Sequence, residues 1–178
     1  MTTQLMQKIG FIYASIVLTI LMVTHVPVLL NQTAPLQISF VQAFLMIFPM
    51  WGLMIFYLNK THVVTLNEEE IKALSLVERL KIIMGNPPQW LFVLTCLFYA
   101  YGLYSLFLWM TGGIMDPELV NGQYQSNNHG QMSYYSQEEY LKMHRTNMLA
   151  TTGFFLMFAS FSFAVFFPKK EKTESFMP

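Results

Sequence analysis

The sequence has few charged residues and almost no cysteine. Only 11% of its 178 residues are Asp, Glu, Lys or Arg, against about 25% in soluble globular domains. The ten basic and ten acidic residues cancel, so the chain has no electrostatic signature of a nucleic-acid-binding protein. Its single cysteine, Cys96, excludes an intrachain disulfide framework.

Charged residues are missing above all from four apolar runs. Each run is about 21 residues long, enough for a helix that crosses the ~30 Å hydrocarbon core of a bilayer. The sequence therefore predicts an all-α membrane protein, a single membrane domain over 1–178 with four transmembrane helices. Their expected bounds are 9–30, 38–58, 90–110 and 146–167.

The Lys and Arg residues outside the spans indicate the orientation, because cytoplasmic loops are enriched in them. The amino terminus, the 58–89 connection and the carboxyl-terminal tail hold all of them except Lys142 and Arg145. This distribution predicts a multi-pass protein of the bacterial inner (plasma) membrane with both termini cytoplasmic. The segment 111–145 then lies outside.

The long cytoplasmic connection has a helical pattern of its own. Thr65 followed by Glu68 and Asn67 followed by Glu70 both suit a helix start, and Gly85 to Pro88 suits a helix end. Between them, apolar residues such as Leu76, Leu80 and Ile83 recur at helical spacing. We expect an amphipathic helix over 67–84 on the cytoplasmic membrane surface. Whether it lies on lipid, on the protein's own bundle or on a partner remains open.

The outer segment 111–145 contains most of the specific polar residues. Asn121-Gly122 and His129-Gly130 flank a short run with Tyr124, and glycine at such turns favours a short β-hairpin. Ser136 and Glu139 form the Ser-x-x-Glu pattern of a capping box. It predicts a helix that continues into the fourth span, so 111–145 is expected to form an ordered outer cap.

The same segment carries a resemblance. Gly122-x-Tyr124, Asn128-His129-Gly130 and Ser136-x-x-Glu139-Tyr140 precede the last span, while Thr24-His25-x-Pro27 and Phe48-Pro49-x-Trp51-Gly52 lie in the first two. In these motifs the chain resembles a family of small uncharacterised four-span bacterial membrane proteins. The resemblance covers most of the chain. It implies the four-span fold and no particular activity, so it assigns no functional residue.

Three histidines on the outer side raise the question of a metal or haem site. Imidazole is a common metal ligand, and His25, His129 and His144 are the candidates. However, His25 is expected inside the first span and His144 just above the fourth, a difference in depth of about 10 Å at helical rise. The sequence also lacks the spacing of a known metal motif. No cofactor is therefore predicted, although a haem- or metal-dependent redox membrane protein remains the alternative.

Ion-coupled transport and catalysis find little support. Coupled transporters use ionisable residues inside the membrane, and the four spans contain no Asp, Glu, Lys or Arg. For catalysis, the candidates are an acid at Glu138 or Glu139, a nucleophile at Ser133 or Ser136 and a base at His129 or His144. A helix cap explains Ser136 and Glu139 better, and no nucleophile elbow or zinc-protease motif is present.

These observations favour an accessory or interaction subunit without catalysis of its own. Its expected partners are the lipid bilayer and a membrane protein or a second copy of the chain, and not nucleic acid. An immunity protein against a pore-forming toxin is a further alternative. The residues most suited to an interaction lie in the outer segment: Tyr124, Asn128, His129, Glu139 and Tyr140.

Overall fold

The computed structural model describes residues 2–36, 38–61, 74–111, 118–128 and 131–168. Within them it contains five helices and one three-stranded antiparallel sheet. The helices are α1 (Thr3–Leu29), α2 (Phe40–Lys60), α4 (Leu76–Ile83), α5 (Gln89–Thr111) and α6 (Gln137–Phe166), and the strands are β1 (Glu118–Val120), β2 (Gln123–Asn128) and β3 (Gln131–Tyr135). Four of the helices, α1, α2, α5 and α6, are long and apolar enough to cross a membrane, as the sequence predicts.

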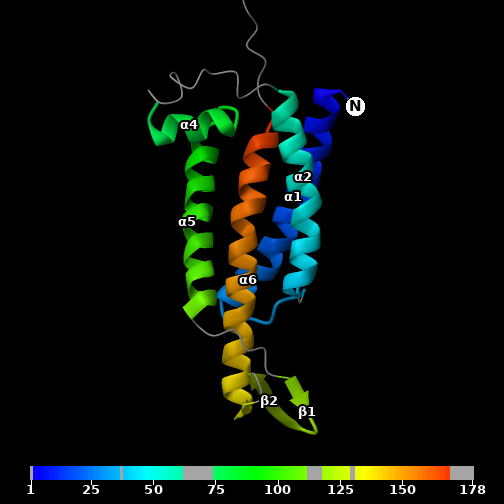
Figure 1. The fold of residues 1–178 in the computed structure, drawn as a ribbon, viewed down its shortest axis with the longest axis vertical. Helices are drawn as coiled ribbons and strands as arrows, with labels where there is room; N and C mark the ends of the chain where they lie inside the picture. Colours follow the sequence, from blue (N-terminus) through cyan, green and yellow to red (C-terminus); the bar gives the residue numbers. More distant parts are fainter. Residues whose placement is uncertain (1, 37, 62–73, 112–117, 129–130, 169–178) are drawn as a thin grey trace, which may run out of the picture.

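The helix α6 forms the centre of the bundle, with α1, α2 and α5 around it (Figure 1). In its most apolar stretch 72% of the residues are buried, against 28–33% in the other three long helices. The reason is a series of small side chains that lets neighbouring backbones approach closely. The buried small residues of α6 are Ala150, Thr151, Thr152, Gly153, Ala159, Ser160, Ser162 and Ala164.

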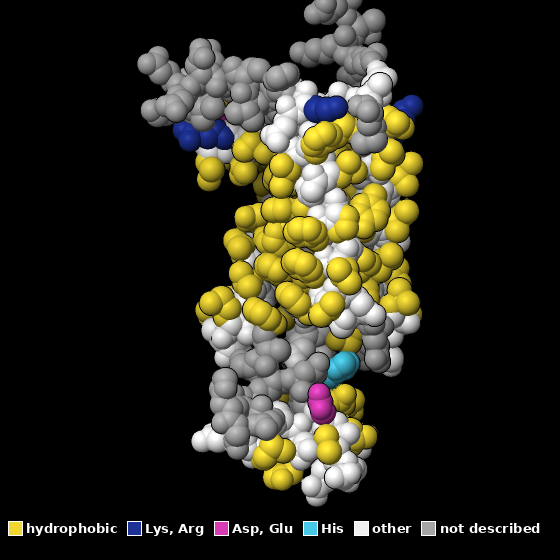
Figure 2. Space-filling view, turned by 45° about the vertical axis from the view of Figure 1, so that its right-hand side comes forward, with side chains coloured by type: hydrophobic (Ala, Val, Ile, Leu, Met, Phe, Trp, Pro, Cys, Tyr) yellow, Lys and Arg dark blue, Asp and Glu magenta, His cyan; other side chains and the backbone are white. Residues whose placement is uncertain are grey.

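The two ends of the bundle differ. The start of α1, the helix α4 and the end of α6 lie at one end, and the sheet lies beyond the other end, next to the first turns of α6 (Figure 1). Figure 2 shows a broad band of hydrophobic side chains between them, with Lys and Arg side chains at the α4 end. Large apolar side chains on the outer faces of α1, α2 and α5 are exposed, as expected for helices in contact with lipid.

Three helices begin at capping boxes, in which a serine hydroxyl accepts from a backbone N–H three residues on. Their serine–partner pairs are Ser39 with Gln42, Ser75 with Glu78 and Ser136 with Glu139. At Ser75, hydrogen bonds from the hydroxyl and the backbone N–H lower the pKa of the Glu78 carboxyl.

The cap at Ser75 corrects one prediction. The sequence pattern predicts a helix over 67–84, but α4 begins at Leu76 because Ser75 is extended and caps it. The prediction is therefore wrong for Leu74 and Ser75, and residues 67–73 lie outside the described part of the chain. The signal that was missed is Ser75-x-x-Glu78, the same pattern that correctly predicts the start of α6.

Close packing of α5 on α6 generates the first prediction. A Cβ at Gly102 would lie 2.5 Å from Met157 Cβ and 3.2 Å from the backbone oxygen of Gly153, whereas a Cβ at Gly52 would meet nothing within 4 Å. Alanine is favoured over glycine in a helix by about 0.5–1 kcal/mol, but overpacking costs about 1–3 kcal/mol. We expect Gly102→Ala to lower the thermal unfolding temperature of the purified protein, and Gly52→Ala to leave it unchanged or raise it. A Gly102→Ala protein as stable as Gly52→Ala would contradict this packing.

Candidate functional site

The sheet is built around the predicted turn at Asn121-Gly122. Both residues have positive φ, 53° and 80°, as in the two-residue turns that join antiparallel strands. Val120 and Gln123 are paired across this turn. The hairpin is thus present, and β3 pairs with β2 to extend it to a third strand in the order β1-β2-β3. The link between β2 and β3, residues 129–130, lies outside the described residues.

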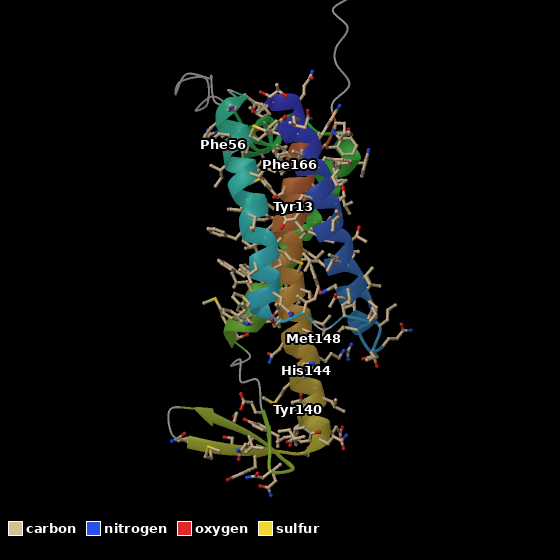
Figure 3. The ribbon with its side chains drawn as sticks, turned by 90° about the vertical axis from the view of Figure 1, so that its right-hand side faces the viewer. Tyr13, Phe56, Tyr140, His144, Met148 and Phe166 are labelled. Carbon is tan, nitrogen blue, oxygen red and sulfur yellow. The ribbon has the colours of Figure 1, made fainter. Side chains whose placement is uncertain are left out.

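One face of the sheet is fastened to α6. The ring of Tyr124 stacks on that of Tyr140 at a centroid distance of 4.3 Å and an interplanar angle of 16°, and Tyr140 stacks on His144 at 5.8 Å. Tyr140 and His144 are one turn apart on the same side of α6 (Figure 3). We call the sheet and the first two turns of α6, residues 137–144, the cap. The stack joins the sheet to the central helix.

The predicted interaction residues lie in the cap in different settings. Tyr124 and Tyr140 are half-buried in the stack, and Glu139 accepts hydrogen bonds from the backbone and hydroxyl of Ser136. Asn128 pairs with Gln131 at the end of β2, and His129 lies outside the described residues. Tyr124, Tyr140 and Glu139 therefore already serve to build the cap.

The opposite face of the sheet carries exposed apolar side chains. The register places Val120, Met132 and Tyr134 on the face away from Tyr124. Their side chains are 36%, 44% and 64% exposed. The sequence analysis missed these residues, although the alternation in Gln131-Met132-Ser133-Tyr134 would have placed Met132 and Tyr134 on one face.

A second polar site lies inside the bundle around His25, which is 4% exposed. Its Nδ1 is 2.7 Å from Thr152 Oγ1, and its Nε2 is 2.9 Å from the hydroxyl oxygen of Tyr101. Thr152 donates to the carbonyl oxygen of Met148 at 2.6 Å, so it accepts from His25 Nδ1–H. When the ring is neutral, the Nε2 atom accepts from the Tyr101 hydroxyl. This assignment satisfies both ring nitrogens, and it joins α1, α5 and α6.

This arrangement bears on the metal and haem candidates. A histidine binds a metal through a ring nitrogen that has no other partner, and both nitrogens of His25 are engaged. Its partner Thr152 is eight residues from His144, about 12 Å along α6, so His25 and His144 do not form one site. Among the described residues no group of three His, Cys, Asp or Glu side chains lies close enough to hold a metal ion.

Arg145 performs a structural function next to this network. Its Nε donates to the carbonyl oxygen of Val28 at 3.0 Å and its Nη2 to that of Leu29 at 3.2 Å. These are carbonyls of the last turn of α1, where a positive charge also interacts favourably with the helix dipole. One of the two basic residues of the 111–145 segment thus ties the end of α1 to α6.

Comparison with protein-family models, with curated proteins and with solved structures returns no match. The resemblance to small four-span bacterial proteins therefore stays a prediction. The function has to be argued from the residues of this chain.

The His25 network generates the second prediction. Tyr101→Phe removes the hydroxyl that donates to Nε2 and keeps the ring. Hydrogen bonds between transmembrane helices contribute about 0.6 kcal/mol on average and up to about 1.7 kcal/mol, so we expect a loss of about 1 kcal/mol in the free energy of unfolding in bicelles. Tyr104→Phe is the control, because Tyr104 is on the same helix and is exposed. Equal losses in the two variants would contradict a stabilising bond to His25.

Proposed function

We propose that this protein is an accessory subunit of a membrane assembly, without catalysis of its own, and that it binds its partner through the exposed face of the sheet. The observation that carries the proposal is the exposed face with Val120, Met132 and Tyr134, on a sheet held beyond the bundle. Aromatic residues and Met are enriched at protein interfaces. The stack of Tyr124 on Tyr140 joins this sheet to α6, and a preformed face lowers the entropic cost of association.

The interior of the bundle supports an accessory function. His25, which is buried inside the bundle, has both ring nitrogens engaged. The branch through Thr152 ends at the carbonyl oxygen of Met148, which has no proton to pass on. The polar network thus joins helices, and a redox or metal function through His25 gains no support from this geometry.

We place the cap on the outer side of the bacterial inner membrane, with both termini in the cytoplasm. One end of the bundle supports this orientation, because it contains the start of α1, the helix α4 and the end of α6. Lys8, Lys60, Arg79 and Lys81 belong to that end, as the excess of basic residues in cytoplasmic segments requires.

The orientation has a direct test. Alkaline phosphatase is active only outside the cytoplasm, so a fusion that ends after Gln125, in β2, should be active. A fusion after Lys60, at the end of α2, should be inactive, while the same pair of fusions to a cytoplasmic reporter should give the reverse result. Activity of phosphatase after Lys60 and not after Gln125 would invert the orientation.

Binding through the cap is tested by co-purification from native membranes. The double variant Met132→Glu and Tyr134→Glu places two charges on the exposed face, and charges without partners are costly to bury in an interface. We expect recovery of the partner to fall by about tenfold or more, since 1.4 kcal/mol corresponds to a tenfold change in affinity. The partner is identified by mass, a second copy of the chain included.

The control for this experiment is Gln137→Glu combined with Leu141→Glu. Both residues are exposed on the first turns of α6, outside the sheet face. This variant should retain the partner. Absence of any partner from the wild-type preparation, or equal loss in the two double variants, would contradict binding through the exposed face of the sheet.

A further inference from the structure

A groove of about 560 Å³ lies between α2, α5 and α6 next to α4. The helices α2 and α5 are on opposite sides of α6 (Figure 1), and residues of all three helices line the groove. Tyr99 and Leu103 line the groove and are about half exposed. The groove is therefore open toward the lipid, and its volume is in the range of small-molecule sites, about 300–1,000 Å³.

Two polar atoms in the groove lack a partner. Thr95 is only 1% exposed, yet its Oγ1 makes no hydrogen bond to any described residue, and neither does the buried Nε1 of Trp51. Both residues line the groove. The contrast with Thr24 is informative, since its hydroxyl donates to a carbonyl one turn earlier in its own helix. A buried polar group without a partner costs about 1–3 kcal/mol, so the two atoms indicate a missing acceptor.

The lining determines the chemistry of what binds. The indole N–H only donates, and a threonine hydroxyl donates as well as accepts, so both can donate to a carbonyl oxygen. All residues that line the groove are uncharged, which favours a neutral molecule. Tyr99 lies on one side, and on α6 the ring of Phe158 is packed edge to face with Trp51 at 4.8 Å. Such aromatic walls suit a flat ring.

The depth of the two polar atoms distinguishes between occupants. Thr95 is six residues from the start of α5, about 9 Å, and Trp51 is nine residues from the end of α2, about 14 Å. The ester carbonyls of phospholipids lie near the boundary of the ~30 Å hydrocarbon core. They are therefore closer to the membrane surface than the two polar atoms of the groove. A spanning helix from another protein, about 10 Å wide, would collide with α4, because Leu76, Leu80 and Met84 close that end of the groove.

We infer that this groove binds a neutral lipid with a carbonyl-bearing ring, of the isoprenoid quinone class. The ring lies between Tyr99 and Phe158, its carbonyl oxygens accept from the Thr95 hydroxyl and the Trp51 indole, and its tail extends into the bilayer. This site is separate from the cap and does not depend on the proposed partner.

The test is equilibrium binding of decylubiquinone to the full-length protein in phosphatidylcholine nanodiscs. Saturable binding is expected. Thr95→Val keeps the shape of the side chain and removes the hydroxyl, and should weaken binding about fivefold to tenfold, the effect of one buried hydrogen bond. Ala100→Phe, at an exposed position that lines the groove, should fill the space and abolish binding.

Two matched variants and a second probe complete the experiment. Thr111→Val on α5 and Gly52→Phe on α2 make the same kinds of change outside the groove and should bind as the wild type does. Decylbenzene, which has a ring and no carbonyl, should bind at least fivefold more weakly than decylubiquinone. Absence of saturable binding, equal affinity for the two probes, or equal effects of Thr95→Val and Thr111→Val would overturn the assignment.

Discussion

The close contact of α6 with three other helices is the interaction on which the rest of the structure depends. Apolar side chains gain nothing from leaving lipid for one another, so helices in a bilayer associate through tight packing and hydrogen bonds. The helix α6 supplies the packing through residues such as Ala150, Gly153 and Ala159. At Gly153 even a Cβ would overlap the side chain of Ser105 on α5. The approach that brings these backbones together also brings polar side chains into hydrogen-bonding range.

The polar side chains of the bundle differ in whether this approach satisfies them. His25 is reached by Tyr101 from α5 and by Thr152 from α6, and both of its nitrogens are used. Thr95 is as deeply buried as His25 and lies on the same helix as Tyr101. However, it lines the groove together with Trp51, and its hydroxyl has no partner among the described residues. In surroundings that contain no water, a satisfied polar group joins helices, and an unsatisfied one marks a position where something else can bind.

Much of the fold could be predicted from the sequence, because the features that determine it are local. The charge-free runs predict α2 and α5 within two residues at each end, whereas α1 begins at Thr3 and not at residue 9, and α6 begins well before its run, at the cap of Ser136. That cap and the turn at Asn121-Gly122 depend on residues close to each other in the chain. The stack of Tyr124 on Tyr140 and the bonds of His25 could not be predicted. The stack depends on how far α6 extends beyond the bundle, and the bonds of His25 depend on how each helix is rotated about its own axis. The hydrophobic periodicity of the sequence determines neither of them.

The groove was missed for the same reason, since Trp51 and Thr95 are ordinary residues of apolar spans until the helices are assembled. The geometry of α6 also separates the two proposed sites. Phe158 in the groove and Tyr140 in the cap are eighteen residues apart on the same straight helix, about 27 Å at helical rise. Residues this far apart with no shared partner usually contribute independently. Charges placed on the sheet should therefore leave the groove intact, and filling the groove should leave the cap free to bind, so failure at one site would not imply failure at the other.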